Sequence, residues 1–380
     1  LDKVFGRLTR FAVKHTSTGK RFLAARTEME RTLSEVRQER DSLKAALAVR
    51  IETEKALSEV LTQRDQIARE RDALKIIRDV LVAERDSLQC QLSKYGEGPP
   101  FVPNGHFYSP IPSKAEIQRD EKRIFADWPR TLPNIDLRES QQVTLLEKIA
   151  TFYHDLPFQD QPVNGLRYRY KNTAYGYSDA IFLNGMLRHL KPNRVIEIGS
   201  GYSSCMLLDT NERWLNNAIK CSFIEPYPEL LNSLLTETDR KNTTIYPSRV
   251  QDVDLALFSE LGPNDVLFID STHVGKTGSD VNHLFFEVLP ALKEGVYIHI
   301  HDIFFPFEYP RHWAEQGIAW NEQYMLRTFL QNNFDYEIVL FNTFLTHFHA
   351  DFFRKHMPLC LENPGGSIWL RKTRSDARPG

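Results

Sequence analysis

Aspartate and histidine side chains follow two successive predicted strands in the carboxyl-terminal part of this 380-residue chain. One strand ends in FIDSTHVGK, which carries Asp270 and His273. The next ends in IHIHD, which carries His301 and Asp302. The carboxyl ends of parallel strands open onto the same edge of a sheet, so we expect a shared cleft. A histidine there can act as a general base, and the same residue types can bind a metal ion.

A glycine turn follows an earlier predicted strand, in RVIEIGSGYSS at 194–204. Glu197 precedes Gly199 and Gly201, and glycine lets the backbone come close to a ligand. The helix that follows presents free N–H groups, which suit polar or anionic groups. Glu225 ends the next strand in FIEPYP, where an acid commonly accepts hydrogen bonds from ribose hydroxyls. These residues predict a cofactor that contains adenosine.

Two classes of adenosine cofactor compete for this turn. A dinucleotide site has the pattern G-x-G-x-x-G, but its last position is Ser204 here. S-adenosylmethionine has no pyrophosphate to accommodate and is therefore favoured. A nicotinamide-dependent oxidoreductase on the same fold stays an alternative.

EIGSG, followed in order by IEP, FID and LKEG, resembles the motifs of the class I S-adenosylmethionine-dependent methyltransferases over about residues 165–372. The resemblance implies that Glu197 contacts the amino-acid end of the cofactor, that Glu225 holds the ribose and that Asp252 contacts the adenine. Three candidates, Tyr175, Tyr177 and Ser178, come from a tyrosine-rich segment before the first strand, of a kind that often closes over the cofactor; core packing is the alternative. The complete predicted cofactor set is Glu197, Gly199, Gly201, Ser203, Glu225, Asp252, Asp270, Tyr177 and Ser178.

The strand-end residues also resemble a metal-dependent subset of sugar and small-molecule O-methyltransferases. In that subset an Asp ends the fourth strand, a His lies three residues on, and an acidic pair ends the fifth. Asp270 and His273 match the first half, whereas His301 replaces one acid of the pair. The resemblance implies a divalent metal on Asp270, His301 and Asp302, with His273 as general base and His301 as a second catalytic residue. Magnesium prefers oxygen ligands and an imidazole suits manganese, iron or zinc, so metal dependence stays open.

His301 can instead form a cofactor wall or a hydrogen bond to the substrate, and His273 can instead cap its loop. His299 lies on the same face of its strand as His301, and we expect it to be a satisfied core histidine.

Alternating strands and helices from 141 to 380 predict an α/β fold with a doubly wound, Rossmann-like, mainly parallel sheet of seven strands. The expected strands are 194–198, 220–225, 243–248, 265–270, 295–302, 337–342 and 367–372. The expected helices are 142–155, 178–190, one from the glycine turn to about 209, 227–237 and 278–293.

The first 140 residues have three compositions. Residues 1–24 form a basic amphipathic lead-in, either a simple extension of the next helix or a segment that contacts a membrane surface. Residues 25–95 contain no glycine or proline and carry leucine heptads, which predict a coiled coil that makes a homo-oligomer. Residues 96–140 are rich in proline and glycine and predict a linker that packs on the catalytic domain at 141–380.

Charge and cysteine content limit the expected partners and compartment of the protein. The formal net charge of −2 gives no reason to expect a nucleic-acid partner. Four scattered cysteines suit a reducing compartment, and we expect a cytoplasmic enzyme, with peripheral membrane contact open. The expected reaction moves a methyl group to a hydroxyl of a small-molecule or glycan acceptor; nitrogen as the acceptor atom stays open. A non-catalytic coiled-coil scaffold is the second alternative.

Overall fold

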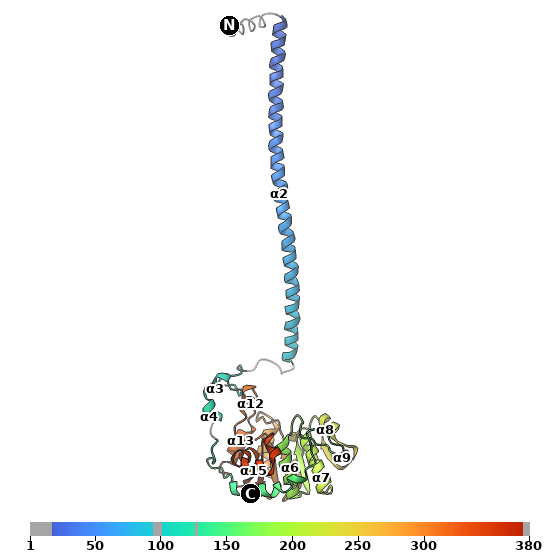
Figure 1. Ribbon diagram of the computed structural model, residues 1–380, viewed down its shortest axis with the longest axis vertical. Helices are drawn as coiled ribbons and strands as arrows, with labels where there is room; N and C mark the ends of the chain where they lie inside the picture. Colours follow the sequence, from blue (N-terminus) through green and yellow to red (C-terminus); the bar gives the residue numbers. More distant parts are fainter. Residues whose placement is uncertain (1–16, 94–100, 126–127, 375–380) are drawn as a thin grey trace. The chain divides into compact units, whose positions relative to one another are not determined.

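The computed structural model describes residues 17–93, 101–125 and 128–374 of the chain. The chain divides into two compact units, Leu1–Pro99 and Pro100–Gly380 (Figure 1). Within the described residues, no helix has the length and hydropathy needed to cross a membrane.

Residues 17–93, the described part of the first unit, form one helix, α2 (Ser17–Ser93), of 77 residues. At 1.5 Å per residue it is about 115 Å long. It begins earlier than residue 25, so part of the predicted basic lead-in is helical; residues 1–16 of that lead-in lie outside the described residues. The heptad residues of its first half, from Leu33 to Leu61, are between 41 and 65 % exposed. On its surface Arg26 pairs with Glu30, and Arg50 pairs with Glu54. In each ion pair the partners lie one helical turn apart.

The second unit is built on a seven-stranded sheet, which confirms the predicted fold class. Its order is β3-β2-β1-β4-β5-β7-β6, with β1 to β5 parallel and β7 antiparallel to both of its neighbours. The strands are β1 (Arg194–Ile198), β2 (Lys220–Ile224), β3 (Thr244–Tyr246), β4 (Val266–Ile269), β5 (Tyr297–His301), β6 (Tyr336–Phe341) and β7 (Ser367–Lys372).

Helices cover the sheet, and three of them differ from the prediction: α5 ends at Ala150 rather than at residue 155, and two other predicted helices are interrupted. The segment 227–237 forms two helices because Leu235 and Thr236 are extended between them, and the segment 278–293 contains a π-helical turn, Leu284–Val288. The helices are α3 (Lys114–Arg119), α4 (Glu121–Phe125), α5 (Glu139–Ala150), α6 (Tyr177–Leu190), α7 (Tyr202–Trp214), α8 (Glu229–Leu234), α9 (Glu237–Asn242), α10 (Asp280–His283), α11 (Leu289–Ala291), α12 (Arg311–Glu315), α13 (Glu322–Leu330), α14 (Asn342–Phe348) and α15 (Ala350–His356).

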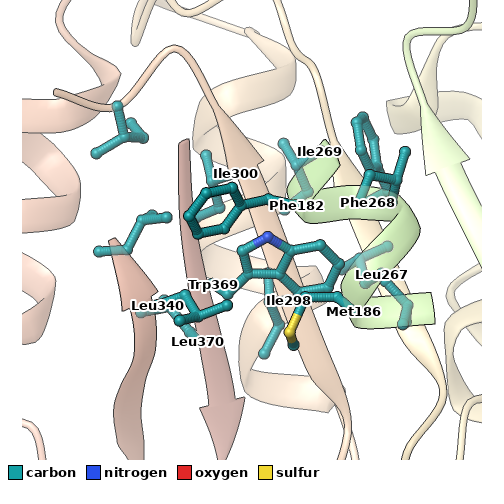
Figure 2. Packing of buried hydrophobic residues seen from close by; sticks show 14 of the residues in the cluster. Phe182, Met186, Leu267, Phe268, Ile269, Ile298, Ile300, Leu340, Trp369 and Leu370 are labelled. Carbon is teal, nitrogen blue, oxygen red and sulfur yellow. The ribbon is translucent and has the colours of Figure 1, made fainter. Parts of the chain in front are cut away.

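The hydrophobic core lies around the central strands and fixes the sheet edge that carries the polar residues. Trp369 of β7 is fully buried in one cluster with Phe182 and Met186 of α6, and Ile298 and Ile300 of β5 belong to the same cluster (Figure 2). Full burial of a side chain of this size contributes about 1.5 to 3 kcal/mol. The core also takes in Leu132, Ile135 and Leu137, from the segment that the sequence predicts as a linker.

Candidate active site at the carboxyl edge of the sheet

The glycine turn joins β1 to α7 at the centre of this edge. Gly199 has a φ of +77°, and a Cβ atom added there would lie 1.9 Å from the carbonyl oxygen of Asp270. Its N–H donates to the carbonyl of Ile224 at 3.0 Å, at the end of β2. Glycine is therefore required at this position, because the turn is packed between the ends of two neighbouring strands.

Glu197 is buried beneath the turn, and its carboxylate accepts two hydroxyl hydrogen bonds. Ser203 Oγ donates at 2.5 Å and Ser204 Oγ at 2.6 Å, and the Gly201 N–H donates to Ser204 Oγ at 3.1 Å. Burial raises the pKa of Glu197 to about 8, although the two serines oppose the shift. Glu197 thus ties β1 to the first turn of α7, and its predicted contact with the cofactor stays a prediction.

Glu225 lies beside the same turn at the end of β2. It is half-buried and accepts hydrogen bonds from the backbone N–H groups of Ser200 at 3.1 Å and Tyr227 at 2.8 Å. The hydroxyl of Ser200 is buried and has no hydrogen-bond partner among the described residues. A carboxylate and an unpaired hydroxyl at a glycine turn fit the hydroxyl-rich ribose of an adenosine cofactor.

Three other predicted cofactor residues already have partners or are buried. The Tyr177 hydroxyl donates to Asp160 at 2.6 Å, and its ring stacks on Tyr170. Ser178 is fully buried in the first turn of α6, which closes its side chain to a ligand that enters from solvent. Asp252 is exposed and paired with Arg249 at 2.8 Å, and this guanidinium lowers the pKa of Asp252. The roles predicted for these three residues stay predictions.

Asp270, His273, His301 and Asp302 lie together, as the strand ends predict. Asp270 Oδ1 is 3.3 Å from His273 Nε2 and 3.4 Å from His301 Nδ1. Asp302 Oδ2 is 3.6 Å from each of the same two nitrogens. We call these four residues the edge cluster. The Asp270 side chain is its most open member, at 30 % exposed, whereas both histidines are buried.

Two further acids support the histidines from behind. Glu322, fully buried at the start of α13, lies 2.9 Å from His273 Nδ1 through Oε2 and accepts from the Ser271 hydroxyl through Oε1. Asp179 of α6 lies 3.5 Å from His301 Nε2 and is held by the Ser367 hydroxyl at 2.8 Å. Each ring therefore has one nitrogen directed at the edge cluster and the other at a supporting carboxylate.

The charges of the edge cluster are strongly coupled. Burial disfavours charge on His273, but the carboxylates of Asp270 and Glu322 outweigh it and raise the pKa of His273 to about 10. Burial likewise works against His301, yet Asp302 and Asp270 raise its pKa well above the ordinary value. Burial raises the pKa of Asp302, whereas for Asp270 the two histidines outweigh burial and hold the pKa below its usual range.

A family model and a relative match the part of the chain that holds this site. A family model described as "Methyltransferase domain" matches residues 196–303, which run from β1 to just beyond β5. An uncharacterized protein of Archaeoglobus fulgidus is 32 % identical over 196 residues, which cover 50 % of this chain and 85 % of that protein. This chain therefore contains a domain of the methyltransferase family.

Solved methyltransferases with low identity to this chain are also similar. The O-methyltransferase TomG from Streptomyces achromogenes, solved with S-adenosylmethionine, is 16 % identical and aligns over 69 % of this chain and 96 % of its own with a TM-score of 0.34. The Podospora anserina methyltransferase PaMTH1, bound to S-adenosylhomocysteine, is 14 % identical over 73 % and 99 % of the two chains, with a TM-score of 0.35.

For this methyltransferase, the geometry does not support His273 as a free general base. Both ring nitrogens face carboxylates, and a ring with a pKa of about 10 is already protonated at neutral pH. His299 is a core residue as expected, stacked on Phe268 at 4.2 Å between ring centroids. It is not satisfied, however, because neither of its nitrogens has a hydrogen-bond partner among the described residues.

Sequence reasoning did not identify the two supporting acids of the methyltransferase. Neither Asp179 nor Glu322 belongs to the strand ends or to the glycine turn on which the predicted site rests. The sequence does contain one signal for Asp179. An acid in an otherwise apolar helix, as in SDAIFLNGML, often faces a buried partner.

An aromatic wall follows β5 and borders the edge cluster. Trp320 lies 4.3 Å from the ring of His273, and Trp313 packs edge-on against Trp320 at 5.1 Å. Tyr309 stacks on Trp313 at 6.1 Å. Trp313 and Trp320 are half-buried, and Tyr309 is buried. Aromatic rings beside a few polar groups, here those of the edge cluster, are typical of a small-molecule site.

Proposed function

We propose that this methyltransferase transfers the methyl group of S-adenosylmethionine to a hydroxyl group of a small molecule, with a sugar or glycan as the acceptor class. The observation that supports it is the edge cluster, whose residue Asp270 also packs its backbone carbonyl against Gly199 of the cofactor turn. Carboxylates and imidazoles beside the cofactor turn suit a hydroxyl acceptor, which must lose its proton as it is methylated.

The cofactor side of the proposed reaction uses the turn between β1 and α7. S-adenosylmethionine, when bound, supplies a methyl group on a positively charged sulfur. The Glu225 carboxylate would accept hydrogen bonds from the ribose, and the unpaired Ser200 hydroxyl would bond to the same cofactor. Glu197 would keep the turn in place through Ser203 and Ser204.

The acceptor side of the proposed reaction uses the edge cluster. Asp270 is its most open carboxylate and would accept the hydrogen bond of the acceptor hydroxyl. The aromatic wall that begins at Trp320 would stack on the apolar face of a sugar ring.

A divalent cation also fits this side. Asp270, His301 and Asp302 have ligand atoms that all lie within 4.8 Å of one another. A cation there would lower the pKa of the acceptor hydroxyl. Asp270, His301 and Asp302 would then bind the cation, and the burial of His273 and His301 would help to exclude water.

Calorimetric titration with S-adenosylhomocysteine, first with EDTA and then with added magnesium or manganese, tests the proposal. We expect micromolar binding, and turnover of a panel of sugar and phenol acceptors measured as release of S-adenosylhomocysteine. Asp302→Ala should abolish turnover and leave the far-UV circular dichroism unchanged. The matched control is Asp351→Ala, an exposed aspartate on α15. Unchanged turnover in Asp302→Ala would contradict the proposed site, and methylation of amines alone would contradict a hydroxyl acceptor.

We also propose that α2 joins copies of the chain. The proposal is supported by the apolar seam from Leu33 to Leu61, which is exposed to water in a single helix. Burial of such a seam against another helix is what stabilises a coiled coil.

A further inference from the structure

We propose that an apolar groove beside the edge cluster binds the hydrocarbon part of the methyl acceptor, so that the acceptor is an amphipathic molecule, a sugar that carries an alkyl chain. The groove has a volume of about 600 Å³, and the residues that line it come from the segments 275–286 and 321–329. The inference rests on the proposed function for the hydroxyl that is methylated, and it adds the chemistry of the rest of the acceptor.

The lining of the groove is apolar. Phe285, Phe286, Met325 and Phe329 contribute hydrocarbon and thioether surface, and Tyr324 contributes its ring. None of the described residues that line the groove carries a charge. The groove therefore favours an uncharged hydrocarbon ligand, which is stabilised by leaving water.

Two aromatic side chains of the groove are exposed to solvent. Phe286 is 62 % exposed and Tyr324 is 41 % exposed. Phe285 and Phe286 are consecutive residues of the π-helical turn, a feature that is frequent at functional sites. Phe285 is buried and packs edge-on against Phe329, with 5.6 Å between the ring centroids. One phenylalanine of the pair thus joins the core, and the other is left for a ligand to cover.

The groove adjoins the edge cluster through the loop that carries His273. Gly275 lies two residues beyond His273, and a Cβ atom added to it would lie 2.7 Å from Met325 Sδ. Met325 therefore packs directly on the backbone of this loop. Asn321 holds the loop in place, because its Oδ1 accepts from the Gly275 N–H at 2.6 Å and its own N–H donates to the His273 carbonyl at 3.0 Å.

The aromatic wall also adjoins the groove. Trp320, whose ring lies 4.3 Å from that of His273, directly precedes Asn321, and Asn321 lines the groove. The edge cluster, the aromatic wall and the groove are therefore neighbouring surfaces. They suit, in that order, the reacting hydroxyl, the sugar ring and the alkyl chain of one acceptor.

The size of the groove favours this ligand over another copy of the chain. Eight residues line it, whereas a stable interface between proteins uses about 20 to 30 residues on each side. Its volume lies within the range of about 300 to 1,000 Å³ that is typical of small-molecule sites. An alkyl chain that continues from the sugar matches a site of this size, and a folded partner requires a larger one.

Alkyl glucosides of increasing chain length test the inference. The full chain is titrated with butyl, hexyl and octyl glucoside below their micelle concentrations, with and without S-adenosylhomocysteine, and the dissociation constants are measured by ligand-observed NMR. Each methylene that the groove takes up should raise the affinity by up to about fourfold. We expect octyl glucoside to bind at least tenfold more tightly than butyl glucoside. An affinity that does not depend on chain length would overturn the inference.

Phe286→Glu places a carboxylate in the groove at an exposed position. It should lower the ratio of octyl to butyl affinity at least fivefold, and so should Thr328→Glu on α13. The matched control is Phe334→Glu, which makes the same change at a phenylalanine that is 80 % exposed and lies outside the groove, and it should keep the wild-type ratio. Far-UV circular dichroism checks that the variants fold. Equal ratios in Phe286→Glu and Phe334→Glu would overturn the inference, as would a fall in molar mass in Phe286→Glu alone, which would show that another copy covers the groove.

Binding of S-adenosylhomocysteine separates this inference from the proposed function. A chain that binds S-adenosylhomocysteine but shows no dependence on chain length would overturn the inference and leave methyl transfer standing. A dependence on chain length that Phe286→Glu removes, in a chain that does not bind S-adenosylhomocysteine, would support the groove and contradict the proposed reaction.

Discussion

The two units of this chain use apolar residues in opposite ways. In α2 the leucines are exposed along a helix that pairs its charges with each other on the surface, as Arg50 does with Glu54. In the second unit Trp369 and its neighbours are fully buried, and charged groups such as Arg167 are enclosed with their partners. The contrast teaches that a sheet covered by helices completes its core by itself, whereas the seam of α2 is left exposed within one chain, which is why we propose that another chain covers it.

The five tryptophans offer a way to test the contrast. All of them lie in the second unit, at positions 128, 214, 313, 320 and 369. Tryptophan fluorescence therefore reports unfolding of the second unit alone, and far-UV circular dichroism reports both units.

The largest expected effect is in the second unit, at Gly199→Ala. A Cβ there would meet the Asp270 carbonyl at 1.9 Å, and the φ of +77° disfavours any other residue. We expect a loss of about 3 kcal/mol or more in the free energy of unfolding, measured by tryptophan fluorescence in urea. Gly278→Ala is the matched control, because its φ is +70° and its Cβ would meet nothing within 4 Å. It should cost only about 1 to 2 kcal/mol, and equal losses in the two variants would show that the close approach is unimportant.

The next effect concerns the enclosed charges, at Arg167→Ala. Arg167 pairs with Asp209 at 2.8 Å and Asp239 at 2.7 Å, and both carboxylates are buried. Its loss leaves them without their cation, and we expect a cost of about 3 to 5 kcal/mol in the same urea experiment. Lys241→Ala, which breaks an exposed pair with Glu237 on α9, should cost no more than about 0.5 kcal/mol. Similar costs for the two variants would contradict the distinction between enclosed and surface charges.

The third prediction concerns the seam of α2. The double variant Leu43→Asp, Leu47→Asp should remove about 2 to 3 kcal/mol of association per chain and lower the molar mass measured by light scattering to that of one chain. Its control is Ala45→Asp, Ala48→Asp, which adds the same charge off the seam. Tryptophan unfolding should stay the same in both. A wild-type chain that is already monomeric would contradict the proposed oligomer.

The fourth prediction concerns a pH dependence from Glu197. Its folded pKa of about 8 lies above the ordinary value of 4.5, so the folded state holds a proton that the unfolded state has lost between these pH values. This contribution to stability is present below pH 4.5 and falls as pH rises toward 8, by about 1.4 kcal/mol per pH unit. Glu197→Gln should remove that part of the slope. Urea unfolding at pH 5.5 and 7.5 measures it, and an unchanged difference between wild type and variant would contradict the raised pKa.

Much of the fold could be predicted because its signals are local. The apolar run RVIEI predicts a strand at 194–198, where β1 is found. The strand-end positions of Asp270 and His301 predict their meeting, since parallel strands share one edge. The breaks in 227–237 and 278–293 are not predicted, because helix composition runs through both segments, although Thr236 and Asp239 form a capping box that begins α9.

The sequence by itself determined a seven-stranded α/β fold, a long helix with an apolar seam, and an edge where acids and histidines gather. Only the tertiary structure decided what surrounds that edge. Glu322 lies 49 residues beyond His273 in the chain, and Asp179 lies on a helix before β1. No local pattern links such pairs, because their contact depends on how α13 and α6 pack against the sheet. The surroundings of His273 follow from that packing, since Glu322 lies behind its ring and Asp270 and Asp302 lie in front of it.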